Sequence, residues 1–379
     1  MAPPPQQHIG FLDALRGWAI FGVIFWHVQF SVGEFPGKAF FATGNYGVQL
    51  FFLLSALTIC LSSYDRFHRE RRPAMAFLIR RACRILPMWW MAIILHNFAC
   101  PTPVFKNFTP SFLQLVETAV FANAYNAARI MHYVMGGWSI AVEMAAYLLL
   151  IPVLRYAKTP VHAVGILVFT ILLTKVGFVL FGLKQWHGFN IPEALLEATG
   201  SFSIFFNAPA FAMGILLFFL FRKNHVLPFQ TWLQHKVLMV TLVFSGLFFM
   251  AYHSVHYIPV VFIYSALFAV LVCHLWRAEN KFIANRFTTY LGKISFSCYV
   301  WHFVVWKWLE CLANSQGIAL VRNSGLENLL AFLVLLTATT ILTMLLSHFS
   351  YEWIESKGMN FGRWASGRVT NTPTKIQTA

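Results

Sequence analysis

Long, nearly continuous runs of hydrophobic residues alternate with short polar segments along this chain. A helix needs about 20 mainly apolar residues to cross roughly 30 Å of hydrocarbon. Ten runs approach that length, and they lie at residues 12–33, 45–64, 76–98, 138–156, 162–183, 203–221, 236–254, 257–276, 288–309 and 328–350. The pattern predicts an all-α membrane protein, a polytopic helical bundle of about ten transmembrane helices.

The segments outside these runs suggest little further organisation. A weaker apolar run at 111–125 is too short and too polar for a span, so we expect an interfacial or re-entrant helix there. Residues 1–356 are predicted to form one transmembrane domain, followed by a short cytoplasmic polar tail at 357–379. We expect no cleavable signal, because the chain before the first run has no basic start.

Composition and charge support this class and set an orientation. Hydrophobic residues make up 58% of the chain and charged residues 11%, which is far from the balance of a soluble protein. If the amino terminus is cytoplasmic, 19 of the 28 Lys and Arg residues lie in cytoplasmic segments and five in outside loops. The positive-inside rule therefore predicts that both termini are cytoplasmic. It also accounts for the net charge of +15 without a nucleic-acid partner, since no soluble domain carries a basic face.

The first run contains three ionisable residues, Asp13, Arg16 and His27, that a plain membrane anchor would not need. Arg16 and His27 are eleven residues apart, so they share one helix face and are separated by roughly 16 Å along the axis. Burying such groups is costly, and they usually face a polar cavity. Arg16 could instead extend to the nearby membrane surface, and His27 could be a structural histidine satisfied within the bundle. If both are functional, they line the same slot.

A cluster of arginines enters the third run. Arg80, Arg81 and Arg84 are three and four residues apart, which makes them neighbours on a helix surface. Positive-inside anchoring is one explanation. Guanidinium groups at this spacing also form a fork for phosphate oxygens, which a topology signal alone does not require.

A carboxylate lies in the outer half of the run at 138–156. Glu143 needs a partner at that depth. The predicted topology allows pairing with His27 or with His302, and His302 itself has either a structural hydrogen bond or a role at the site.

Six segments combine such charges with apolar residues in a fixed order. They are "FLDALRGWAIFGVIFWHV", "GVQLFFLLSALT", "FLIRRACRILPMWW", "WSIAVEMAAYLLLIPVL", "YLGKISFSCYVWH" and "YEWIE". Together they resemble the acyltransferase type-three family, bacterial integral-membrane acyltransferases that modify surface glycans, Nod factors and some antibiotics. The resemblance covers nearly the whole chain. Two departures from the family pattern, Ala56 after Ser55 and Met144 after Glu143, leave the charged positions intact.

The resemblance implies a donor, a site and a location. The donor is an acyl-coenzyme A, usually acetyl-coenzyme A, used from the cytoplasm, and the acceptor is a hydroxyl of a glycan or glycolipid at the outer leaflet of the bacterial inner membrane. The family's functional residues fall on Arg16 and His27, on Arg81 and Arg84, and on Glu143. We expect no metal, since no His/Cys cluster has ligand spacing.

These residues suggest a mechanism for an O-acetyltransferase. Arg16, Arg81 and Arg84 bind the donor's phosphates, and His27 and Glu143 form the catalytic pair. His27 acts as general base or as an acyl-carrying nucleophile, because a neutral imidazole suits either role. Without acyl transfer, intramembrane charges would also suit a secondary transporter of a small anionic or sugar-like solute, although no internal repeat supports that alternative.

Overall fold

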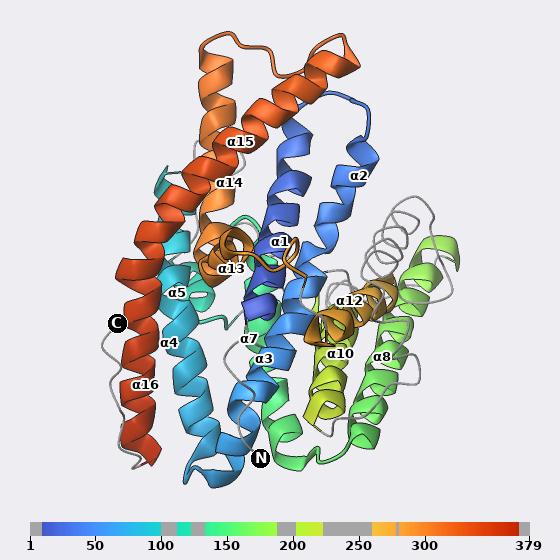
Figure 1. The fold of residues 1–379 in the computed structure, drawn as a ribbon, viewed down its shortest axis with the longest axis vertical. Coiled ribbons are helices and arrows are strands. Elements are labelled where there is room, and N and C mark those ends of the chain that lie inside the picture. Colours follow the sequence, from blue (N-terminus) through green and yellow to red (C-terminus); the bar gives the residue numbers. More distant parts are fainter. Residues whose placement is uncertain are drawn as a thin grey trace.

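The computed structural model describes residues 10–99, 112–122, 133–187, 202–222, 260–277 and 280–370. Within these ranges every regular element is a helix (Figure 1). The helices are α1 (Gly10–Val28), η2 (Gln29–Ser31), α2 (Lys38–Ala42), η3 (Thr43–Tyr46), α3 (Gly47–Arg69), α4 (Pro73–Ile94), η4 (Leu95–Ala99), α5 (Phe112–Ala119), α7 (Gly137–Tyr156), α8 (Pro160–His187), α10 (Ile204–Arg222), α12 (Val260–Arg277), α13 (Arg286–Lys293), α14 (Ser295–Ser315), α15 (Gly325–Ser350), η7 (Tyr351–Glu355) and α16 (Ser356–Thr370). The predicted all-α class is confirmed for this part of the chain.

Helix α1 lies at the centre of the bundle and contacts helices from both halves of the chain. It packs against α3, α13, α14 and α15, while α3 also contacts α10, and α10 contacts α8 and α12 (Figure 1). Ten of its 19 residues are buried, including Leu12, Ile20 and Ile24. The predicted site residues of α1, Arg16 and His27, therefore lie on a helix that is packed on several sides.

The short helix α13 fixes the beginning of α1. Asn285 and Thr288 form a capping box, in which the Asn285 side chain accepts from the Thr288 backbone N–H and the Thr288 hydroxyl accepts from the Asn285 backbone N–H. At Gly292 the two backbones touch, because an added Cβ would overlap the carbonyl oxygen of Asp13. Only glycine permits this approach. Asp13 is thereby held next to α13.

Six helical segments among the described residues are long and apolar enough to cross a membrane, which makes this a multi-pass membrane protein. They are Gly10–Ser31, Lys38–Arg69, Gly137–Tyr156, Pro160–Gly177, Ile204–Arg222 and Gly325–Thr370, with a shorter apolar helix at Val261–Trp276. The total of about ten and the cytoplasmic placement of the termini stay predictions. One of the ten predicted spans, 236–254, lies outside the described residues.

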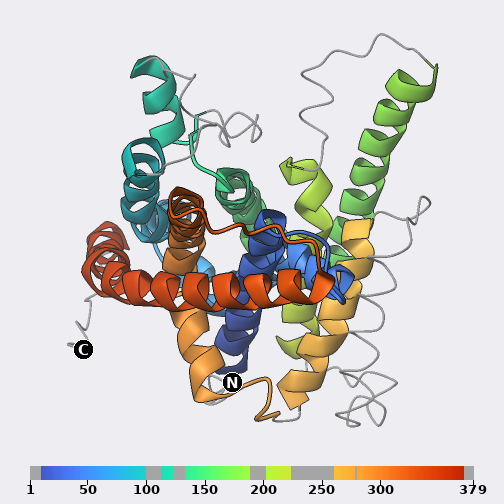
Figure 2. The same cartoon turned by 90° about the horizontal axis from the view of Figure 1, so that it is seen from above.

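The carboxyl-terminal helices wrap around the bundle. Figure 2 shows α15 lying across the other long helices, and the chain then continues through the π-helical turn η7 into α16. Helix α16 packs along α4, with Gly358 and Gly362 against Cys83. The predicted tail at 357–379 is therefore helical and packed as far as Thr370, and the boundary of the predicted domain at 356 stays a prediction.

Candidate active site

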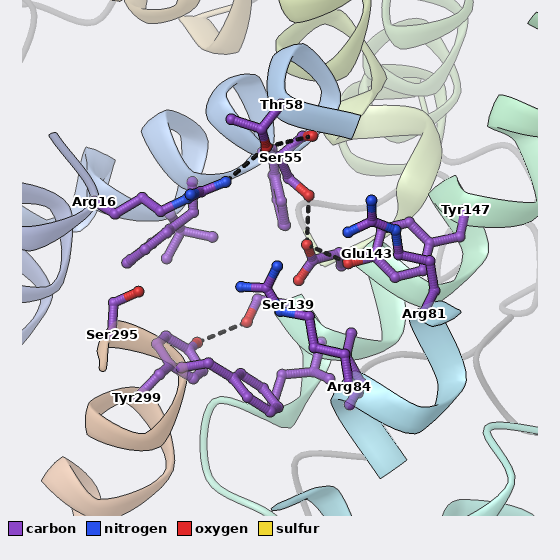
Figure 3. Close-up of a pocket in the computed structure, with 16 residues that line it drawn as sticks. Arg16, Ser55, Thr58, Arg81, Arg84, Ser139, Glu143, Tyr147, Ser295 and Tyr299 are labelled. Carbon is purple, nitrogen blue, oxygen red and sulfur yellow. Dashed lines mark hydrogen bonds between the residues drawn. The ribbon is translucent and has the colours of Figure 1, made fainter. Parts of the chain in front are cut away.

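A polar cavity of about 80 Å³ lies between α1, α3, α4, α7 and α14 (Figure 3). Its lining includes Arg16, Arg81, Arg84 and Glu143. Four of the five residues that the sequence singles out thus lie around one cavity, although they come from three separate helices.

Glu143 is held by two hydroxyl groups. Its Oε1 accepts from Ser55 Oγ at 2.5 Å and from Tyr147 OH at 2.7 Å. Tyr147 lies one turn further along α7, whereas Ser55 comes from α3. Both donors bind the same carboxylate oxygen, and Oε2 accepts no hydrogen bond from a residue that the structure describes. Figure 3 shows the guanidinium groups of Arg81 and Arg84 on either side of this carboxylate.

Arg16 is bound within the protein. Its Nη1 donates to Asp13 Oδ1 at 2.8 Å and its Nη2 to Thr58 Oγ1 at 2.6 Å, and only 15% of the side chain is exposed. These contacts hold the guanidinium beside α3 rather than extended along the helix surface. The cavity explanation of Arg16 therefore fits the structure better than extension to the membrane surface.

Two neighbouring arginines on α4 differ in their partners. Arg80 donates from both terminal nitrogens to the Glu70 carboxylate, each at 3.0 Å. Arg81 makes a single long bond to Ser62 Oγ at 3.4 Å, and its Nε is buried without a partner within the described part of the chain. Its guanidinium also lies over the ring of Tyr147 at 5.8 Å. Arg80 is therefore a structural residue and does not contribute to the predicted phosphate fork.

Arg84 has unused hydrogen-bonding capacity. Among the residues that the structure describes, its guanidinium makes no hydrogen bond and no ion pair, although it lines the cavity. The carboxylate of Glu355, which does not line the cavity, attracts this guanidinium electrostatically. Glu355 is 1% exposed and accepts from Ser297 Oγ at 2.9 Å. None of the five guanidinium N–H groups of Arg84 is therefore used by a residue that the structure describes.

Sequence reasoning did not assign roles to several of these polar residues. Tyr147 could have been found from its four-residue spacing from Glu143, and Glu355 from its place in the segment "YEWIE". The partner hydroxyls of Ser55 and Thr58 have no signal along the chain that links them to α7 or α1.

His27 and His302 form a second cluster. The Nδ1 of His27 lies 2.8 Å from the carbonyl oxygen of Val23, and the Nδ1 of His302 lies 2.8 Å from that of Tyr299. A carbonyl only accepts, so each Nδ1 carries the proton and each Nε2 has the lone pair. The two ring centroids are 5.2 Å apart. His27 is half-buried, whereas His302 is 1% exposed and its Nε2 has no hydrogen-bond partner among the described residues.

A third histidine nearby is fully bonded. The backbone N–H of Met135 donates to His96 Nδ1 at 3.2 Å, and His96 Nε2 donates to the Val300 carbonyl at 3.4 Å. Both ring nitrogens are used, so His96 is structural.

A family model described as an acyltransferase domain matches residues 9–348. The chain belongs to the acyltransferase type-three family. Its apolar helices and this match make it a multi-pass membrane acyltransferase. The matched range includes all five predicted site residues and ends before Glu355. No curated protein and no solved structure matches the chain.

The acyltransferase does not form the pair that we predict between Glu143 and His27. Glu143 binds Ser55 and Tyr147, while His27 binds its own helix at Val23. Nor does His302 bind Glu143, since its Nδ1 donates to backbone carbonyls. The prediction compared depths in the membrane, and depth alone does not place two side chains on facing surfaces.

The arginine cavity and the histidine cluster of the acyltransferase are adjacent but distinct. Arg16 lines the cavity and His27 does not, so the two residues do not share one lining. Tyr299 connects the two places, because it lines the cavity and its ring centroid is 5.4 Å from that of His302. Within the described residues, no group of three or more His, Cys, Asp or Glu side chains could hold a metal ion.

Proposed function

We propose that this acyltransferase moves an acetyl group from cytoplasmic acetyl-coenzyme A to a hydroxyl of a cell-surface or exported glycan or glycolipid, in the bacterial inner membrane. The acceptor class and the compartment rest on the family to which the chain belongs.

The observation that carries the donor proposal is the unused bonding capacity of Arg81 and Arg84. Guanidinium groups within a helical bundle normally find acceptors, because an unpaired donor away from water is costly. Arg81 and Arg84 are half-buried. Here one guanidinium has a single long bond, the other has none among the described residues, and both line the same cavity. Phosphate oxygens match their planar donor geometry. We therefore assign the donor's diphosphate to Arg16, Arg81 and Arg84.

Glu143 belongs to this donor site in the proposal. Its fixed carboxylate lies between Arg81 and Arg84 and limits the repulsion between the two cations while no ligand is bound (Figure 3). It serves as a positioning residue for the arginines and takes no part in orienting the base.

His27 is the proposed general base. Its Nε2 lone pair takes the proton of the acceptor hydroxyl while the hydroxyl oxygen attacks the thioester carbonyl carbon. The carbon–sulfur bond then breaks, and the imidazolium returns the proton to the leaving thiolate, which leaves as free coenzyme A. The Val23 carbonyl holds the tautomer that this step needs.

The test is donor turnover by the purified protein in lipid nanodiscs. With acetyl-coenzyme A and an acceptor extract, we expect release of free coenzyme A thiol, and Arg84→Lys should raise the donor concentration for half-maximal rate severalfold, because lysine cannot donate bidentately. Arg80→Lys is the matched control on the same helix, and it should leave that concentration unchanged. An unchanged donor requirement in both Arg81→Lys and Arg84→Lys contradicts the proposed phosphate site.

A further inference from the structure

A second cavity, which is larger and mostly open to the surroundings, lies outside the site described above, beside the amino-terminal end of α1. Its volume is about 660 Å³, and its lining includes Asp13, Lys281, Asn285, Arg286, Tyr290 and Lys293. We call it the α13 cavity, because most of its lining residues lie on α13 or next to it. Nothing in the proposed transfer step uses these residues.

The α13 cavity is strongly basic. Lys281, Arg286 and Lys293 are all exposed, and none of them makes a hydrogen bond or an ion pair to a residue that the structure describes. Lys293 has one partner, the ring of Tyr351 at 4.8 Å. The acid in the lining, Asp13, is already bound to Arg16. Three cations therefore face an open space, and none of them has an ion-pair partner among the described residues.

A single ion pair joins the α13 cavity to the arginine cavity. Asp13 lines the former and Arg16 lines the latter, and their side chains are bonded at 2.8 Å. On the other side, Lys293 and Ser295 are two residues apart in the chain and line the α13 cavity and the arginine cavity respectively. The two spaces thus share a wall made by the first turns of α1 and the junction of α13 with α14.

The volumes of the two cavities indicate which part of a coenzyme A donor each could hold. About 80 Å³ accommodates a few water molecules or one end of a chain, but no nucleoside. About 660 Å³ lies within the 300–1,000 Å³ range typical of small-molecule pockets. The ring of Tyr290 offers an aromatic face, and the bond from its hydroxyl to His348 Nδ1, at 2.6 Å, restricts the position of that ring.

We infer that the α13 cavity binds the phosphorylated adenosine of coenzyme A, with Lys281, Arg286 and Lys293 around its ribose phosphate. The inference rests on the proposed function and adds the nucleotide subsite to it. The diphosphate then lies towards Arg16, Arg81 and Arg84, and the thin pantetheine arm continues towards His27.

The test is direct binding, which does not depend on acyl transfer. Adenosine 3′,5′-bisphosphate and coenzyme A are titrated into the purified full chain in nanodiscs of neutral phosphatidylcholine. We expect the double variant Lys281→Gln/Arg286→Gln to weaken binding of the bisphosphate by about tenfold or more, since charge-assisted phosphate contacts are lost. Adenosine 5′-monophosphate should bind the wild type more weakly than the bisphosphate does. The double variant should reduce the affinity for the monophosphate less than the affinity for the bisphosphate.

Two comparisons make the result specific. Lys357→Gln/Arg363→Gln removes two exposed positive charges from α16 and should leave bisphosphate binding unchanged. Arg84→Lys should weaken binding of coenzyme A more than binding of the bisphosphate, because the bisphosphate keeps only one of the two diphosphate phosphates that are assigned to the arginines. An equal loss of bisphosphate affinity in Lys357→Gln/Arg363→Gln, or no loss in Lys281→Gln/Arg286→Gln, overturns the subsite.

The remaining outcomes separate this inference from the proposed function and from a lipid site. Specific bisphosphate binding without coenzyme A release would support the subsite and contradict acyl transfer from this donor. If coenzyme A is released but Lys281→Gln/Arg286→Gln leaves bisphosphate binding unchanged, acyl transfer from this donor is supported and the subsite is contradicted. If anionic lipid in the nanodisc abolishes bisphosphate binding, the phosphate that occupies the cavity is a lipid headgroup, and the nucleotide subsite is wrong.

Discussion

At the scale of single residues, backbone carbonyl groups decide which histidine can act as a base. Val23 and Tyr299 each accept from an Nδ1–H, so His27 and His302 both have their lone pair on Nε2. His96 uses both nitrogens and has no lone pair available. His27 is the more exposed of the two candidates, since it is half-buried and His302 is buried.

Replacing His27 tests the proposed base. His27→Gln keeps hydrogen bonding but cannot accept a proton at neutral pH, so it should reduce turnover by about 10² to 10⁴ at normal abundance. His27→Ala should do the same. In the wild type, transfer should fall on acidification, because the protonated imidazole has no lone pair. The measurement is coenzyme A release and protein abundance on the same membranes.

The results that would contradict this assignment are equally definite. Near-normal turnover of His27→Gln would exclude proton abstraction by His27 and favour His302. Disappearance of both His27 variants from the membrane would indicate a structural histidine instead. His96→Gln is the control for a structural role, and it should lower abundance more than turnover per molecule.

The sequence predicted which charged residues lie together better than it predicted their partners. Arg16, Arg81, Arg84 and Glu143 all line one cavity, and each stands out along the chain because a charge within an apolar run is costly. Glu143 binds Ser55 of another helix, and Arg80 binds Glu70 and is therefore not available to a phosphate. Both interactions join segments that lie apart along the chain. Spacing along one helix carries no information about such contacts.

At the scale of elements, the pattern of hydrophobic residues does not predict α13 as a separate helix. The apolar run at 288–309 predicts one continuous span, whereas the structure has α13, a break at Ile294, and then α14. The capping box of Asn285 and Thr288 and the glycine at 292 were readable signals of a short helix at a close contact. The break matters because it turns Lys293 towards the α13 cavity while Ser295 lines the arginine cavity.

Gly292→Ala tests this close contact. The added methyl group would overlap the Asp13 carbonyl oxygen, and we expect a loss of about 1–3 kcal/mol in stability, the usual cost of overpacking. The measurement is the thermal unfolding midpoint of the purified protein. Gly165→Ala is the matched control, because a Cβ there meets no atom within 4 Å. It should be neutral or slightly stabilising, since alanine favours helix. Equal midpoints for wild type and Gly292→Ala would show that α13 is not packed on α1 as described.

At the scale of the whole molecule, the number of spans is the part of the fold least accessible from hydropathy. Helices α4 and α14 are 22 and 21 residues long, but they are not among the six helical segments that qualify by length and apolarity. Both carry site residues, Arg81 and Arg84 on α4 and His302 on α14. The apolar runs at 76–98 and 288–309 predict spans at these two helices, so polar residues that a helix places inside the protein weaken its apolar signal without removing it.

Topology is tested by labelling single cysteines in intact cells. The excess of basic residues in the predicted cytoplasmic segments places the α3–α4 turn inside and the α14–α15 connection outside. In a background with Cys100→Ser and Cys311→Ser, Arg71→Cys should resist an impermeant thiol reagent, and Gln316→Cys should react, since both positions are exposed in the structure. Permeabilised cells, in which both should react, are the control. The opposite pattern would place Arg81 and Arg84 at the outer face, away from cytoplasmic acetyl-coenzyme A, and would contradict the donor site together with the orientation.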